Sequence, residues 1–101
     1  YINGKKAIVG RIINNKNEGK WSYYYPSGEL ESEGHFKNDV TVEKWIWYYR
    51  NGQIMEEGIY VNGKREGLWK LYFEDGGIKK SVLFKKGNIV SSFNPETQVA
   101  S

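Results

Sequence analysis

The sequence predicts an all-β protein in which tandem 24-residue β-hairpin repeats form an elongated, twisted antiparallel meander sheet. Tryptophans recur every 24 residues, at Trp21, Trp45 and Trp69. Glycines keep the same spacing, at Gly4, Gly28, Gly52 and Gly76. No segment has apolar residues at the period of about 3.6 that is typical of an amphipathic helix. Repetition at a fixed spacing of this length is typical of repeat architectures.

Each repeat has two strand-forming segments joined by a four-residue turn, with the sequence PSGE, RNGQ or EDGG. Asn-Gly and Asp-Gly pairs favour hairpin turns because both residues tolerate positive φ. The first complete hairpin pairs residues 21–25 with residues 30–36, two runs rich in aromatic and β-branched residues. A second turn leads to the next hairpin, at Asn38-Asp39, Asn62-Gly63 or Lys86-Gly87. The pattern predicts about eight strands.

We expect one repeat domain over residues 1–93 and a C-terminal tail over residues 94–101. The domain divides into a partial repeat 1–18, complete repeats 19–42, 43–66 and 67–90, and a degenerate start from residue 91. Pro95 falls where other repeats have strand residues, so the array is expected to end there. The chain begins at Tyr1 instead of Met, so we expect a fragment or a processed form. The compartment is left open, with the cytoplasm slightly favoured.

Alternation along the strands sorts the side chains onto two faces. One face collects the repeated tryptophans, and we expect the structural core there, with Gly34 and Gly58 leaving space beneath neighbouring indoles. Leu30, Ile54 and Ile78 are assigned to the same face. The opposite face has a tyrosine ladder among charged residues, and apolar residues replace polar ones there in the middle repeat. The candidate partner-binding residues on this face are Tyr24, Ile46, Tyr48, Met55, Ile59 and Tyr72.

Several interpretations of these six residues stay open. Exposed apolar residues ringed by charge are typical of contact surfaces, but a second core layer or a dimer contact explains the cluster of Ile46, Tyr48, Met55 and Ile59 almost as well. The tyrosines fit cross-strand packing, and they also fit stacking on sugar rings.

The repeat resembles the bacterial variant of the MORN repeat, whose members are often classed as YwqK-family antitoxins. The residues that carry the resemblance are Trp21 with Tyr24-Tyr25 and Gly28, Trp45 with Tyr48-Tyr49 and Gly52, and Trp69 with Tyr72-Phe73 and Gly76. The resemblance covers residues 1–93 and implies an elongated sheet of hairpins, with roles in protein interaction, in antitoxin or immunity function, or, for eukaryotic relatives, in membrane-lipid association. Glu43 and Val82 stand where the pattern has glycine, and we expect local distortion of the second connector and the third hairpin.

No class of enzyme is indicated. His35 is the only histidine, and cysteine is missing from the sequence, so neither a zinc site nor a catalytic triad is expected. Glu31 and Glu33 lie on the exposed face without an evident pocket, and the glycine-rich phosphate-binding motifs are missing. We therefore expect no catalytic residue, no metal site and no cofactor.

The charge pattern bears on the kind of partner. The net charge is only +3 and is spread evenly, whereas nucleic-acid binders concentrate basic residues on one surface, so we expect no nucleic acid. The lysine runs are two residues long, too short for strong attraction to anionic lipid. We expect a protein partner of unknown identity, with a membrane-lipid or carbohydrate surface as the alternative. An open sheet edge also leaves a homodimer open.

Overall fold

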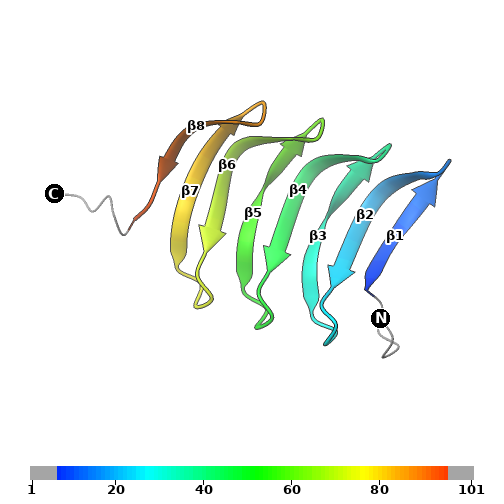
Figure 1. The fold of residues 1–101 in the computed structure, drawn as a ribbon, viewed down its shortest axis with the longest axis horizontal. Coiled ribbons are helices and arrows are strands. Elements are labelled where there is room, and N and C mark those ends of the chain that lie inside the picture. Colours follow the sequence, from blue (N-terminus) through cyan, green and yellow to red (C-terminus); the bar gives the residue numbers. More distant parts are fainter. Residues whose placement is uncertain (1–6, 96–101) are drawn as a thin grey trace.

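The computed structural model describes residues 7–95, which form one antiparallel sheet of eight strands (Figure 1). The strands are β1 (Ile8–Ile13), β2 (Lys16–Tyr24), β3 (Leu30–Lys37), β4 (Val40–Tyr48), β5 (Ile54–Val61), β6 (Lys64–Tyr72), β7 (Ile78–Lys85) and β8 (Asn88–Phe93). Each strand pairs with its neighbours in the sequence, which confirms the predicted meander of tandem hairpins. Residues 1–6 of the predicted partial repeat and residues 96–101 of the predicted tail lie outside the described residues.

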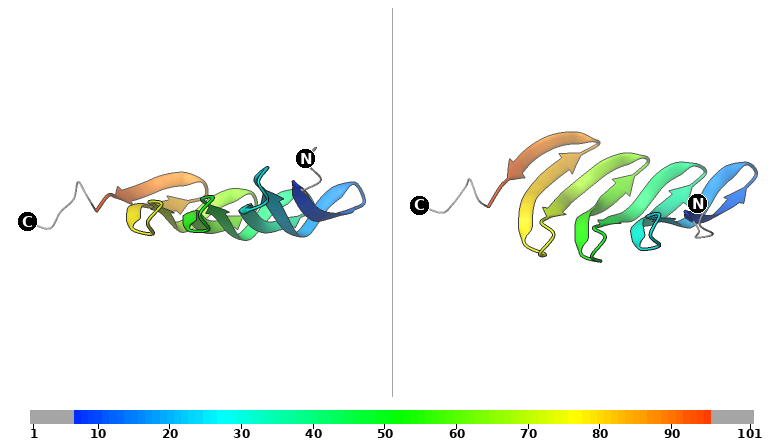
Figure 2. Two further views of the ribbon diagram at one scale, coloured as in Figure 1. Left: turned by 90° about the horizontal axis from the view of Figure 1, so that it is seen from below. Right: turned by 60° about the horizontal axis from the view of Figure 1, so that its bottom comes forward.

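The sheet is long and only one layer thick, with extents of 53 × 31 × 14 Å. Figure 2 shows it from two further sides, and no other element covers either face over residues 7–95. The two outermost strands, β1 and β8, each pair on one side only. Among the described residues there is no helix that could cross a membrane.

Two kinds of turn alternate along the sheet, as predicted. The turns between hairpins place both central residues at positive φ, for example Asn38 at 50° and Asp39 at 68°. This is the type I′ geometry, which matches the natural twist of paired strands. The turns within hairpins have positive φ at one glycine, with Gly28 at 105°, Gly52 at 90° and Gly76 at 96°; Asn51 and Asp75 do not adopt the positive φ that the Asn-Gly and Asp-Gly pairs allow.

The core lies on one face of this single layer. Trp21, Trp45 and Trp69 are 8%, 5% and 0% exposed. Each indole lies over the backbone of a glycine in the preceding repeat: a Cβ on Gly34 would be 1.9 Å from Cδ2 of Trp45, and one on Gly58 would be 2.0 Å from Cδ2 of Trp69. The expected space beneath neighbouring indoles is therefore confirmed, and only a residue without a side chain fits there.

A second row of aromatic rings packs against the indoles on the tryptophan face. The ring of Phe36 meets Trp21 and Trp45 edge-on, at centroid distances of 5.8 and 5.2 Å. The ring of Tyr60 meets Trp45 and Trp69 in the same way, at 6.2 and 5.0 Å. Edge-to-face contacts of this kind are the favoured geometry for aromatic pairs. Each ring of the second row thus joins two successive repeats.

Bulges change the face of three residues that alternation assigns to the tryptophan side. In each hairpin the second strand has one extra residue just after the turn, so that Leu30, Ile54 and Ile78 lie opposite Tyr24, Tyr48 and Tyr72. Residues that pair across strands share a face. The assignment of these three apolar residues to the tryptophan face is therefore wrong: they lie beside the tyrosines.

Glu43 does not distort the second connector. It adopts φ of 60°, close to the 74° of Gly19 and the 76° of Gly67 at the corresponding positions. The pairing of β3 with β4 has the same offset as that of β5 with β6. The expected distortion is replaced by backbone strain, because residues with a side chain rarely adopt positive φ.

Val82 stands where the repeat has glycine, and the change in strand register lies one strand later than expected. The third hairpin keeps its register, with Val82 opposite Trp69. Between β7 and β8 the register shifts by one residue instead of two, so Phe93 lies opposite Ser81. Val82 is 5% exposed and fills the space that a following indole takes over Gly34 and Gly58.

Candidate protein-binding face

The face opposite the tryptophans, here called the tyrosine face, contains a polar network that repeats from one hairpin to the next. Tyr48 donates its hydroxyl hydrogen to Oε2 of Glu33 at 2.7 Å. The other oxygen of this carboxylate lies 3.1 Å from Nζ of Lys20. Lys20 and Glu33 belong to one hairpin and Tyr48 to the next, so the network ties two repeats together.

The same network recurs one repeat later. Tyr72 donates to Oε2 of Glu57 at 2.6 Å, and Nζ of Lys44 lies 3.3 Å from the second oxygen. Tyr24 has no equivalent partner within residues 7–95, because Val9 stands where a glutamate would be. Two members of the predicted tyrosine ladder thus have a structural role.

The network sets the protonation of its members. The hydrogen bond from Tyr48, aided by Lys20, lowers the pKa of Glu33, and the one from Tyr72, aided by Lys44, lowers the pKa of Glu57. Burial, followed by the bond to its glutamate, raises the pKa of Tyr48 to about 12, and the same causes raise the pKa of Tyr72 to about 12. At neutral pH the carboxylates are ionised and the tyrosines neutral, an arrangement that suits structural support better than proton transfer.

The six candidate residues do not form one compact cluster. The three tyrosines form a half-buried row near the hairpin turns. Ile46 is half-buried between Glu33 and Glu57, its partners across the strands. Ile59 lies opposite Lys44. Lys44 is four residues, or roughly 13 Å along β4, from Tyr48, so Ile59 is distant from the tyrosine row.

Met55 occupies the bulge in β5. It lies between Ile54, which pairs with Tyr48, and Glu56, which pairs with Trp47. It therefore has no partner of its own across the strands, and the structure does not place it beside Ile59.

The third repeat departs from the network at two positions together. Leu68 stands where the first two repeats have Lys20 and Lys44, and Ser81 stands where they have Glu33 and Glu57. An ion pair on the tyrosine face is thereby replaced by an exposed leucine and a small hydroxyl group.

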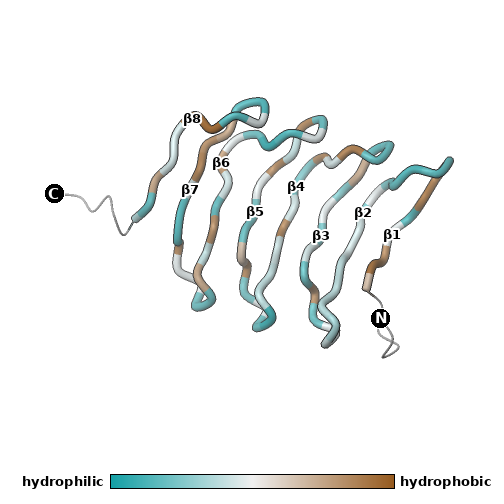
Figure 3. Tube along the Cα trace, in the orientation of Figure 1, coloured by the Kyte–Doolittle hydropathy of each residue, from teal (hydrophilic) through white to brown (hydrophobic). Residues whose placement is uncertain are grey.

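Exposed apolar side chains gather around this replacement. We call them the C-terminal patch, and they are Ile59, Leu68, Leu83 and Phe93, with exposures of 51%, 52%, 39% and 46%. Leu68 lies opposite Leu83, and Phe93 lies opposite Ser81, two residues along β7 from Leu83. Figure 3 shows the hydrophobic stretch along β7 that contributes to the patch.

An open hollow of about 330 Å³ separates Ile59 from Leu68. Lys44, Glu57, Gly58 and Lys70 complete its lining. A second hollow, of about 240 Å³, lies one repeat earlier beside Ile46 and has Lys20, Glu33, His35 and Lys44 in its wall. Of these two hollows, the one in the C-terminal patch is lined by two exposed aliphatic side chains.

Sequence reasoning found Ile59 but missed Leu68, Leu83 and Phe93. The signal is present in the repeat spacing. Leu68 aligns with two lysines, and Leu83 aligns with His35 and Ile59, so both positions change from polar to apolar along the chain. Phe93 was missed because its place on the tyrosine face, opposite Ser81, depends on the register of β7 with β8, which the sequence does not show.

His35 has the one buried polar atom without a partner among the described residues, its Nδ1. No group of three His, Cys, Asp or Glu side chains that could hold a metal ion occurs between residues 7 and 95.

Comparison with protein-family models identifies the repeat. The MORN repeat variant matches at residues 17–38, 44–62 and 65–86, more than half of the chain. The chain belongs to the MORN repeat variant family. The three matches fall on the hairpins β2–β3, β4–β5 and β6–β7. MORN repeats are generally non-catalytic modules for binding and scaffolding. A search of the curated proteins found no match.

Proposed function

We propose that this MORN repeat protein is a non-enzymatic scaffold that binds another protein through its tyrosine face. The observation that carries the proposal is the C-terminal patch, where four apolar side chains are about 40–50% exposed on a sheet face that nothing else in residues 7–95 covers. Contiguous exposed apolar residues with a charged rim are typical of interaction surfaces. The tryptophan face, by contrast, buries Trp21, Trp45 and Trp69 within the sheet itself.

A rigid face suits such a role. The indoles, the second aromatic row and the Lys–Glu–Tyr networks each join neighbouring repeats, so the side chains of the patch are held on a preformed surface. A preformed surface loses little conformational entropy when it binds. The more specific proposal, an antitoxin or immunity role, rests on the resemblance of the repeat to that class of proteins.

The experiment is affinity capture from a lysate of the source organism with a matched variant. The variant is Leu68→Lys with Ser81→Glu, which recreates the ion pair that the first two repeats already contain and leaves the net charge unchanged. We expect the wild-type chain to retain one protein in stoichiometric amount and the folded variant to lose it. Equal retention by both chains would show that the contact lies elsewhere on the scaffold.

Further samples test the alternatives. If the wild-type chain retains no protein but binds phospholipid vesicles or a glycan array, the protein-scaffold proposal is overturned in favour of a lipid or carbohydrate surface. A toxic protein as the retained partner would support the antitoxin role, and a partner with no such activity would contradict it. Sedimentation of the purified chain tests pairing of two copies through β1, where Ile8 and Ile12 are more than half exposed.

A further inference from the structure

We propose that the C-terminal patch binds a peptide segment of its partner in which apolar side chains alternate with carboxylates. This inference rests on the proposed scaffold function and adds the chemistry of the partner. It depends on three features of the C-terminal patch and its rim: the apolar hollow, the engagement of the local carboxylates, and the lysines left without an ion pair.

The hollow supplies the apolar part of the contact. Ile59 and Leu68 form two of its walls, and the tyrosine face continues past Leu68 to Leu83 on the neighbouring strand. Strands β6 and β7 both have partners on either side, so a bound segment cannot add to the sheet as a further strand there. It lies across the face instead, with an apolar side chain in the hollow and others on Leu83 and Phe93.

The carboxylates near the patch are already engaged. Glu57 accepts the hydrogen bond from Tyr72 and lies beside Lys44. Oε1 of Glu66 accepts a hydrogen bond of 2.8 Å from the backbone N–H of Lys86 in the following turn. Each of these carboxylates is thus already stabilised by a donor or a cation of the chain itself.

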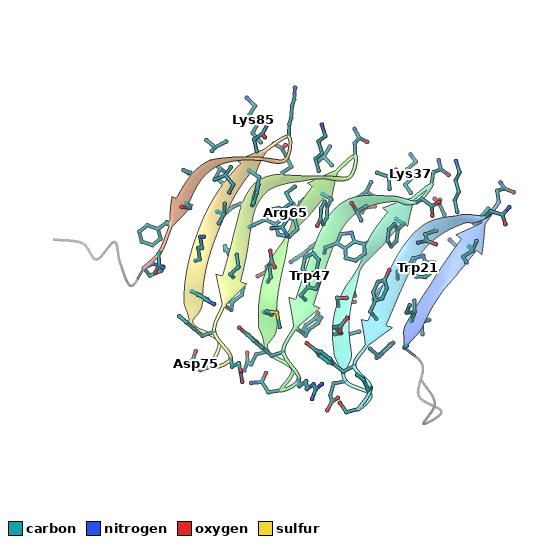
Figure 4. All side chains as sticks on the ribbon, in the orientation of Figure 1. Trp21, Lys37, Trp47, Arg65, Asp75 and Lys85 are labelled. Atoms are coloured by element: carbon teal, nitrogen blue, oxygen red, sulfur yellow. The ribbon has the colours of Figure 1, made fainter. Side chains whose placement is uncertain are left out.

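The lysines around the patch are not engaged in the same way. Within the described residues, Lys64, Lys70 and Lys85 form no ion pair. Lys70 lines the hollow and faces Glu57 and Ser81 across the strands. Lys85 lies two residues along β7 from Leu83, at the turn that joins β7 to β8 (Figure 4). The rim of the patch is therefore positive, which favours an acidic partner through complementary potential.

An acidic peptide fits this surface better than an anionic membrane. Polybasic membrane-binding segments contain clusters of about four to eight Lys or Arg residues. Here Lys64, Lys70 and Lys85 are spread over two strands, and Glu33, Glu57 and other carboxylates share the face. A membrane would meet the fixed negative charges of the whole face, whereas a short segment in the hollow would meet Glu57, which Tyr72 and Lys44 already engage.

The test uses a displayed library of short random peptides, selected on the wild-type chain. We expect the enriched peptides to combine large apolar residues with Asp or Glu. Synthetic copies should lose about tenfold or more in affinity for Leu68→Lys/Ser81→Glu and for Lys70→Glu, which corresponds to at least about 1.4 kcal/mol. Lys80→Glu is the matched control, because Lys80 pairs with Leu71 on the tryptophan face and its reversal changes the net charge equally.

The outcomes separate this inference from the proposed function. Enriched peptides that are basic, or that bind both patch variants as tightly as wild type, would overturn the inference even when lysate capture finds a partner. If the lysate partner depends on the patch but binds through a basic segment, the scaffold function stands and the acidic-segment inference falls. Binding of vesicles containing phosphatidylserine by the wild type alone, with no peptide enriched, would overturn both in favour of a membrane. Circular dichroism of each variant shows that it is folded before it is compared.

Discussion

Replacing Gly58 with alanine tests whether the indole-over-glycine contact holds the repeats together. The added Cβ would lie 2.0, 2.2 and 2.5 Å from Cδ2, Cε2 and Cγ of Trp69. Carbon atoms in van der Waals contact lie about 3.5–4.0 Å apart, so the indole would have to move by roughly 1.5 Å.

The surroundings of Trp69 leave no room for that movement. Its side chain is fully buried, Tyr60 and Phe84 meet it at centroid distances of 5.0 and 6.2 Å, and the guanidinium of Arg65 lies 4.4 Å above its ring. Overpacking a filled core costs about 1–3 kcal/mol, and removal of a buried tryptophan costs about 3–5 kcal/mol. Since the indole must be either compressed or displaced, we expect Gly58→Ala to lower the free energy of unfolding by about 3 kcal/mol or more.

Urea unfolding followed by far-ultraviolet circular dichroism measures this loss. Gly77→Ala is the matched control, because Gly77 has ordinary φ and its Cβ would come no closer than 3.2 Å to another atom, Oδ1 of Asp75. In a Trp69→Leu background the cost of Gly58→Ala should fall below about 1 kcal/mol, since contacting residues couple non-additively. A Gly58→Ala chain that unfolds at the same urea concentration as Gly77→Ala would refute the reasoning.

Three further predictions concern single positions. Glu43→Gly should stabilise the fold by about 0.5–1 kcal/mol, because glycine adopts the observed φ of 60° without strain; a lower thermal midpoint would contradict this. Glu66→Ala should cost about 1 kcal/mol and speed amide hydrogen exchange at Lys86, whose N–H loses its carboxylate acceptor; unchanged exchange would argue against the contact. Ultraviolet titration should show tyrosinate forming near pH 12 from Tyr48 and Tyr72, and Glu33→Gln should lower the first of these values. Because the folded-state pKa values are raised, the stability they contribute is complete below about pH 10 and is lost as the pH rises towards 12. Titration of every tyrosine near pH 10 would count against the networks.

The repeat spacing is sufficient to predict the strands, both kinds of turn and the tryptophan core. The 24-residue spacing holds both for Trp45 and Trp69 and for the glycines beneath them, so each repeat packs against its neighbour in the same way. Asn38-Asp39 shows the same consistency, because a turn is observed where the sequence predicts one.

Bulges limit what alternation can predict. The extra residue in β5 is Met55, and nothing in the side chains of Ile54 or Glu56 shows that the alternation breaks between them. The break depends on how the strand leaves its turn, which is a property of the backbone. For this reason the face predicted for Ile54 is wrong, whereas the face predicted for Ile59, which lies beyond the bulge, agrees with the structure.

The candidate site depends on pairings that a single strand cannot reveal. The bond from Tyr48 to Glu33 joins residues 15 positions apart on neighbouring strands of two successive hairpins, and it turns an apparently available tyrosine into a structural one. Phe93 joins the C-terminal patch through the register of β7 with β8, which departs from the earlier repeats where Val82 stands in place of a glycine.

Because Trp21, Trp45 and Trp69 each rest on a glycine of the preceding repeat, the joints between hairpins are interchangeable. Excision of residues 43–66 would bring Gly34 beneath Trp69 in the geometry that Gly34 now offers to Trp45. The chain would become shorter by two strands, about 9–10 Å, with the remaining joints unchanged. The length and the surface chemistry of such a protein can therefore vary separately. Duplication or loss of a hairpin changes the length of the sheet, and substitutions on the tyrosine face change which partner it binds.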